Sequence, residues 1–172
     1  MSTIFQKKID PIRLAKVGLV IDASFKLATF PRLAEVLAST QGEAHATFTG
    51  FEDEAGQPFM RLHVKATLVV VCQRCVKPYE LPVEHTLVFA PVKDEAAAMG
   101  LSEALEPMLM ENGQVNLLEL LEEELLLLVP PMPKHENEDC IGQTNQAYYA
   151  DLKTRPTQKP FEGLDKLLKS GD

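Results

Sequence analysis

The sequence predicts an α+β fold: an antiparallel β-sheet, or a partial barrel, with a leucine-rich helix packed on it and an extended C-terminal tail. Two patterns indicate the sheet and the helix. Apolar and polar residues alternate over residues 59–72 and again over 79–89, as they do in half-buried strands. Leucines then recur at helical spacing over 117–128, directly before a proline-rich stretch.

The composition is that of a globular protein. The chain has 172 residues, of which 45% are hydrophobic and 24% charged, so it can bury a core without disulfide bonds. Three cysteines do not suit a disulfide framework, and no apolar run approaches the roughly 20 residues that span a bilayer. No apolar targeting segment follows the first lysines. We therefore expect a cytoplasmic protein that does not enter a membrane.

The charge is unevenly distributed along the expected domains. We expect a single domain at residues 1–140 with an acidic linker near 93–114, and a mostly extended tail with one short helix at 141–172. Residues 94–139 contain one basic and twelve acidic residues, a net charge of −11, although the whole chain carries only −8. This segment is either a solvated face or a docking surface for a basic partner. The overall negative charge is unlike that of proteins that coat nucleic acid.

The first half of the domain contains the weaker structural signals. Residues 19–21 predict a first strand, and residues 30–38 predict a short helix that Thr29 would cap. A weak strand is expected over 44–51, followed by a hairpin loop at 52–58.

The central hairpin is the clearest element. Every second residue from Met60 to Cys72 is apolar and is expected to face one side of the sheet. The other side is expected to carry Arg61, His63, Lys65 and Thr67. The partner strand contains Pro82, which lacks an N–H group and therefore predicts an edge or a bulge. His85 is in register with the apolar residues, so we expect it to be a buried histidine rather than a catalyst.

The leucine-rich helix is expected to begin after the acidic linker. Asn116 can cap its first turn, and Glu119 stands at the reciprocal position of a capping box. Leucines at 117, 121, 125 and 128 form one stripe. Glu119 with Glu122 and Glu123 forms a like-charge face, which is either tolerated or offset by a basic partner.

The hairpin turn contains a Cys-Gln-Arg-Cys motif that has two chemical interpretations. A redox function is disfavoured because Cys72 ends a strand and no helix follows Cys75. A metal knuckle is the alternative, since zinc prefers four nitrogen or sulfur ligands, and His135 and Cys140 after the leucine-rich helix supply a second pair. The competing interpretation is that the first two cysteines are small buried hydrophobic residues and Cys140 is a surface thiol.

A basic stripe is a candidate RNA-binding surface. It consists of three residues on one strand face and two at the turn: Arg61, His63, Lys65, Arg74 and Lys77. A plain solvated strand face is the alternative. The sequence contains no phosphate-binding glycine motif, no zinc-protease motif and no nucleophile elbow, so we expect no catalytic residues and no enzyme activity.

Three parts of the chain together resemble the YceD family of large-subunit ribosomal RNA accumulation proteins. They are the long strand ending in Cys72-Gln73-Arg74-Cys75, the acidic-leucine segment 115–125 that runs into Pro130-Pro131-Met132-Pro133, and Asp10-Pro11-Ile12-Arg13 near the start. The resemblance implies a role in the synthesis, processing or stability of 23S ribosomal RNA and implies no known catalytic activity. Many family members carry a second cysteine pair after the prolines, where this chain has His135 and Cys140.

The expected function is therefore that of a non-enzymatic factor for 23S ribosomal RNA accumulation, in ribosome assembly. Its expected partners are large-subunit ribosomal RNA or its precursor, contacted directly or indirectly, and a basic protein bound by the acidic segment 94–139. Two alternatives stay open: a metal-dependent RNA-processing enzyme, and a zinc-stapled protein scaffold without RNA contact.

Overall fold

The computed structural model describes residues 8–102, 105–137 and 140. The chain divides into two units, Met1–His135 and Glu136–Asp172. The first unit contains all the helices and strands discussed below. The predicted C-terminal tail and its short helix lie outside the described residues.

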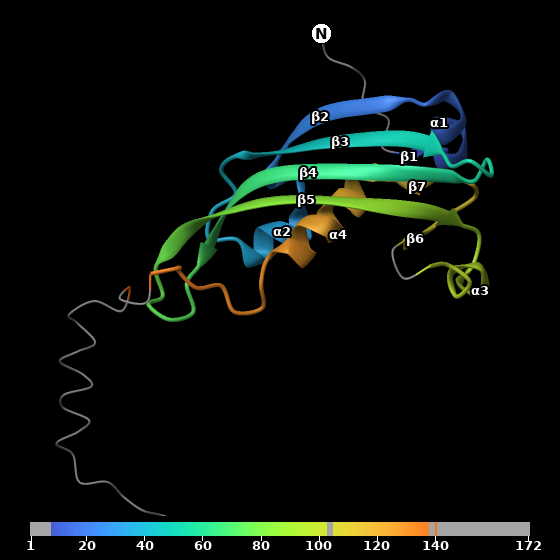
Figure 1. The fold of residues 1–172 in the computed structure, drawn as a ribbon. Helices are drawn as coiled ribbons and strands as arrows, with labels where there is room; N and C mark the ends of the chain where they lie inside the picture. The colour runs from blue at the N-terminus through green and yellow to red at the C-terminus, as the bar shows by residue number, and fades with distance from the viewer. Residues whose placement is uncertain (1–7, 103–104, 138–139, 141–172) are drawn as a thin grey trace, which may run out of the picture. The chain divides into compact units, whose positions relative to one another are not determined.

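The first unit is built on a five-stranded sheet with an extra strand pair (Figure 1). The sheet contains, in spatial order, β2 (Val20–Lys26), β3 (Glu43–Glu52), β4 (Pro58–Val71), β5 (Pro78–Val92) and β6 (Glu106–Leu109). Neighbouring strands are antiparallel except β5 and β6, which are parallel. A short antiparallel pair joins β1 (Lys8–Ile9) to β7 (Val115–Asn116). The predicted α+β class and mainly antiparallel sheet are thus confirmed, and the sheet is open rather than a closed barrel.

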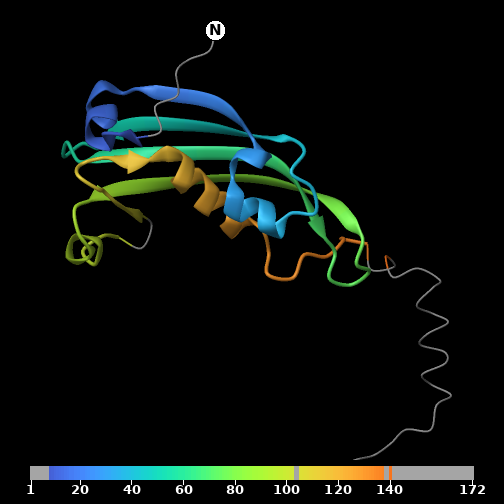
Figure 2. The same cartoon turned by 180° about the vertical axis from the view of Figure 1, so that it is seen from behind.

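The helices are short apart from the leucine-rich one. They are α1 (Pro11–Val17), α2 (Pro31–Val36), α3 (Glu95–Ala98) and α4 (Leu117–Leu128), with a 3-10 turn at Leu27–Thr29. Figure 2 shows α2 and α4 side by side on one face of the sheet. We call this the inner face and the opposite one the outer face. No helix in the described ranges is long and apolar enough to cross a membrane.

The core lies between the inner face and α4, as the alternation predicted. On β4 every second side chain from Met60 to Val70 is 6% exposed or less. On α4 the fully buried leucines are Leu117, Leu121 and Leu125. The Asn116 carboxamide accepts a hydrogen bond from the Leu118 N–H at 3.2 Å, which confirms the predicted N-cap. Pro82 also lies where expected, because β6 pairs only with the end of β5 and leaves the strand at Pro82 on the sheet edge.

Several local predictions are wrong. Thr29 does not cap α2, because it belongs to the 3-10 turn and Phe30 is the N-cap residue. His85 is exposed rather than buried, although its position on β5 faces the same side as the core. The segment interpreted as an acidic linker contains the one-turn helix α3, and it also contains the strand β6, which the sequence analysis did not predict. The sequence analysis also missed α1, which packs against β3 and β4.

Candidate functional site

The Cys-Gln-Arg-Cys motif forms the tight turn between β4 and β5. The Cys72 N–H donates to the Lys77 carbonyl at 2.9 Å, and the Val76 N–H donates to the Cys72 carbonyl at 2.8 Å. Val76 has φ of 59°, a left-handed conformation that is unusual for a β-branched residue. These bonds close the loop with Cys72 buried and Cys75 half-buried. The turn therefore presents two sulfur atoms from one short segment.

The segment after α4 returns to this turn through backbone and side-chain bonds. The Gln73 N–H donates to the Pro133 carbonyl at 2.8 Å, and the Arg74 guanidinium donates to the His135 carbonyl at 2.8 Å. The rings of Tyr79 and His135 lie 4.6 Å apart. Residues separated by about 60 positions in the sequence are thereby brought together, and the His135 imidazole is positioned beside the cysteines.

The geometry of the three side chains suits a tetrahedral metal ion. The Cys75 Sγ and the His135 Nδ1 are 3.5 Å apart, and the ligand atoms of Cys72, Cys75 and His135 all lie within 4.8 Å of one another. Zinc–sulfur and zinc–nitrogen bonds of about 2.3 and 2.0 Å at a tetrahedral angle place the two ligand atoms roughly 3.5 Å apart. Cys75 and His135 therefore have the spacing of two zinc ligands, and the Cys72 sulfur lies within 4.8 Å of both.

The electrostatics favour a thiolate at Cys72. Burial raises the pKa of its thiol, but hydrogen bonds from the backbone N–H groups of His135, Cys75 and Arg74 outweigh this effect and lower the pKa to about 5. The Arg74 N–H lies 3.4 Å from the sulfur. Since metals bind the thiolate rather than the thiol, this environment prepares Cys72 as a ligand at neutral pH.

Cys140 belongs to the second unit of the chain. It follows His135 by five residues. The structure of the first unit thus brings together three of the four predicted ligands, and the fourth stays a prediction.

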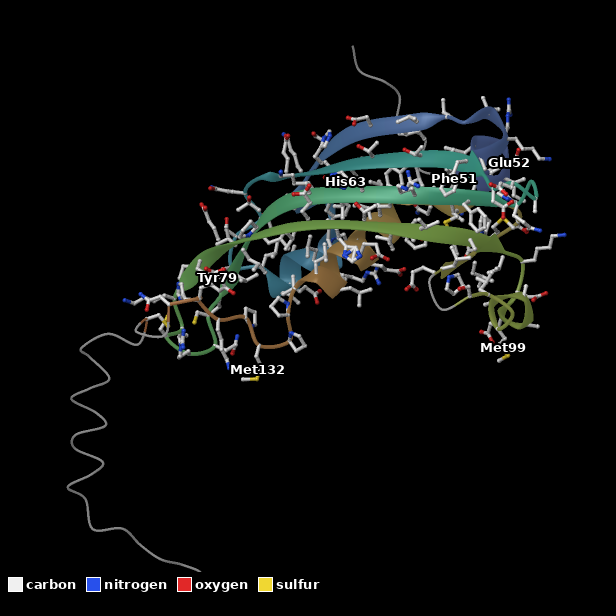
Figure 3. All side chains as sticks on the ribbon, viewed as in Figure 1. Phe51, Glu52, His63, Tyr79, Met99 and Met132 are labelled. Carbon is white, nitrogen blue, oxygen red and sulfur yellow. The ribbon has the colours of Figure 1, made fainter. Side chains whose placement is uncertain are left out.

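The predicted RNA-binding residues divide into two groups. Arg61, His63 and Lys65 lie on the outer face of β4, which Figure 3 shows from the front. Arg74 and Lys77 lie in the turn after β4, where Arg74 serves to hold His135. The RNA-binding role of all five stays a prediction.

Part of the charge on the outer face is neutralised within the sheet. Glu84 on β5 lies 3.4 Å from the Lys65 amine and 3.5 Å from His63 Nε2. His63 Nδ1 is also 2.8 Å from the Thr86 hydroxyl. Of the three basic residues on β4, Arg61 has no carboxylate partner among the ion pairs of the described residues, and its guanidinium lies over an aromatic ring instead.

That ring belongs to Phe51, which the sequence analysis missed. Phe51 and Phe59 face each other across β3 and β4, with ring centroids 5.7 Å apart and an interplanar angle of 29°. The Arg61 guanidinium lies 5.0 Å from the centre of the Phe51 ring. The signal was the outward position of Phe51 in the alternation of β3, but only the strand register shows that it stacks on Phe59. These two half-exposed rings and Arg61 form one aromatic platform.

The acidic face of α4 is not simply solvated. Glu122 is 5% exposed and lies 3.1 Å from the Arg32 Nε. Its carboxylate also accepts hydrogen bonds from the backbone N–H groups of Arg32 and Leu33 at 2.7 and 3.3 Å. Glu123 lies 3.4 Å from the same guanidinium. The carboxylate of Glu122 therefore caps α2, in place of the predicted Thr29.

Comparisons with known proteins identify similar sequences. Residues 60–168 match the family described as "Large ribosomal RNA subunit accumulation protein YceD". A Haemophilus influenzae protein with the same name is 28% identical over 153 residues, which cover 88% of this chain and 88% of the relative. No solved structure matches the chain significantly.

Proposed function

The chain belongs to the YceD family, and from this membership we propose that it is a non-enzymatic factor for the accumulation of large-subunit 23S ribosomal RNA. It would act in the synthesis, processing or stability of that RNA during ribosome assembly. The observation that carries the proposal is the family match over residues 60–168, together with a relative whose name describes this role.

The distribution of side chains supports a binding role rather than catalysis. The candidate metal group consists of cysteine and histidine side chains, a donor set typical of closed structural zinc sites. Glu122 is engaged as a helix cap and is not available as a general acid or base. We infer that this protein acts by holding partners.

We propose two surfaces that bind these partners. The aromatic platform of Phe51, Phe59 and Arg61 would stack unpaired bases, because aromatic and guanidinium planes bind bases without strict sequence preference. The acidic segment 94–139 would bind a basic ribosomal or processing protein. RNA contact would then be local to the outer face, in agreement with the net charge of −8.

We also propose that the candidate metal group binds zinc as a structural ion. Cys72, Cys75 and His135 would supply three ligands, and Cys140 would supply the fourth. Five extended residues reach roughly 17 Å, so the spacing from His135 allows Cys140 to contribute. Bound zinc would fasten the segment after α4 to the β4–β5 turn.

Metal analysis tests the zinc proposal. We expect the purified protein to contain close to one zinc per chain, and His135→Ala to lose it. His63→Ala is the matched control, because this histidine lies on the outer face and pairs with Glu84. Equal zinc contents in the two variants would refute the ligand assignment.

Depletion of the protein in cells tests the proposed function. We expect the ratio of large- to small-subunit ribosomal RNA, precursors included, to fall selectively. Re-expression of the wild-type chain should restore the ratio. An unchanged ratio after depletion would refute the proposal.

A further inference from the structure

A groove at one end of the inner face lies between β6, β7 and the first turns of α4. Its volume is about 280 Å³. It is lined by apolar side chains of Met108, Leu109 and Leu120 and by carboxylates of Glu111, Glu119 and Glu123. Small-molecule sites usually exceed roughly 300 Å³, so the groove suits one or two side chains of a polypeptide better than a whole cofactor.

The apolar part of this groove is accessible. Leu109 is 55% exposed, although it lies in a strand of the sheet. β6 is the last strand in the order of the described sheet, so its outer edge adjoins the groove rather than another strand of that sheet. Met108, next to Leu109, is buried and anchors β6 to the core. A leucine held in this way offers a fixed apolar contact to an incoming side chain.

The charge of the groove is negative and only partly compensated by the chain itself. Lys8 on β1 lies 3.9 Å from Glu111, and Arg32 lies 3.4 Å from Glu123. Glu119 takes part in no ion pair within the part of the chain that the structure describes.

Further carboxylates increase the negative potential beside the groove. Glu124 is the next residue on α4 after Glu123, and Glu106 begins β6. Burial raises the pKa of Glu124, and the negative charges of Glu106 and Glu123 raise it further. An added cation would relieve this repulsion, whereas the phosphates of RNA would increase it.

We propose that this groove binds an extended lysine- and arginine-rich segment of a protein partner, which inserts one apolar side chain against Leu109 and Leu120 and pairs its cations with Glu119 and Glu123. The inference rests on the proposed function and specifies which part of the acidic segment 94–139 makes the contact. The partner is thereby defined as a basic protein with an exposed extended segment. Apolar contact gives the segment a register, and the carboxylates select its charge.

A peptide titration tests the groove directly. The probes are a short synthetic peptide of lysine, arginine and glycine with one central leucine, the same peptide with serine in place of leucine, and polyuridylate. We expect the leucine peptide to shift backbone amide resonances of β6, β7 and the start of α4. The serine peptide should bind about tenfold more weakly, and polyuridylate should not shift these resonances.

Matched charge variants distinguish binding in the groove from nonspecific attraction to the negative charge of the protein. Glu119→Lys should weaken binding of the leucine peptide about tenfold. Glu54→Lys makes the same charge change in the exposed turn between β3 and β4 and should leave the affinity within about twofold. Equal weakening by the two variants, equal binding of the serine peptide, or shifts outside the groove would each overturn the proposal.

Complementation in depleted cells distinguishes a failure of the groove proposal from a failure of the proposed function. The double variant Leu109→Ser/Glu119→Lys should fail to restore the ribosomal RNA ratio. The control Leu127→Ser/Glu54→Lys should restore it, since Leu127 is 78% exposed and does not line the groove. If both double variants restore the ratio, the groove proposal is refuted and the proposed function is unaffected. If depletion does not change the ribosomal RNA ratio, the proposed function is refuted, and the peptide titration alone tests the groove proposal.

Discussion

Glu122 and Arg32, which are 90 positions apart, are joined by both a side-chain ion pair and a backbone hydrogen bond. One carboxylate oxygen accepts from the Arg32 N–H at 2.7 Å, and the other lies 3.1 Å from the Arg32 Nε. The helix α2 has no side-chain cap of its own. A residue of α4 therefore completes α2, and the two helices are fastened together on the inner face.

Removal of this carboxylate is expected to destabilise the protein strongly. Glu122→Ala should lower the free energy of unfolding by about 2–4 kcal/mol, because it leaves two N–H groups at the start of α2 without their acceptor. Denaturant unfolding measures the change. Glu119→Ala, on the exposed side of the same helix, is the control and should cost less than about 0.5 kcal/mol. Similar losses for the two variants would contradict the capping role.

The Cys72 thiol is expected to titrate far below an ordinary cysteine. Its pKa of about 5 compares with roughly 8.5 for a free cysteine. Since the folded-state pKa is the lower one, the thiolate stabilises the fold fully above the unfolded value, and this stabilisation is lost as the pH falls through about 5. Ultraviolet absorbance of the thiolate in metal-free Cys75→Ser/Cys140→Ser protein, which retains Cys72 alone, measures the midpoint.

The denatured variant provides the control for this titration. It should lose its thiolate absorbance near the ordinary cysteine pKa, because unfolding separates the sulfur from the N–H groups that stabilise its charge. A midpoint near 8 in the folded protein would show that those hydrogen bonds do not outweigh burial.

Gly50 is expected to tolerate no side chain. It faces inward on β3, and a Cβ atom there would overlap the Leu14 carbonyl group of α1. Gly50→Ala should therefore displace α1 and lower the free energy of unfolding by about 1–3 kcal/mol. In Gly100→Ala the added Cβ would meet only the Ala97 carbonyl at 3.7 Å, so this control should be nearly neutral. Thermal unfolding of both variants checks the difference.

The sequence was sufficient to predict those elements whose signals are local. The alternation in β4 and the leucine stripe of α4 predicted the two largest elements and most of the core. The helix α1 was also predictable, because Asp10 caps it, Pro11 begins it and Gly18 ends it with φ of 64°. These three residues are ordinary signals of a helix start and a helix end, and the sequence analysis did not interpret them in that way.

The remaining features depend on contacts between distant segments. β6 contains a proline and a glutamate in four residues and is a strand because it pairs with the end of β5. The Glu122 cap and the Phe51–Phe59 stack need the packing of α4 on α2 and the register of β3 on β4. The convergence of His135 on the Cys72 turn was suggested by residue type, but the hydrogen bonds from Gln73 and Arg74 that produce it have no sequence signal.

The aromatic platform yields the last prediction, which concerns RNA. Phe51→Ala should weaken binding of a single-stranded fragment of large-subunit ribosomal RNA by about 1–3 kcal/mol, the usual cost of losing one stacked base. Arg61→Ala should weaken it as well, because the guanidinium lies over the Phe51 ring and adds positive charge beside the bases. Fluorescence anisotropy at fixed salt measures both changes. Thr67→Ala is the control, since Thr67 is exposed on the same face of β4 away from the rings. If Phe51→Ala folds normally and binds RNA as well as Thr67→Ala does, the rings only stabilise the hairpin, and the RNA contact lies elsewhere.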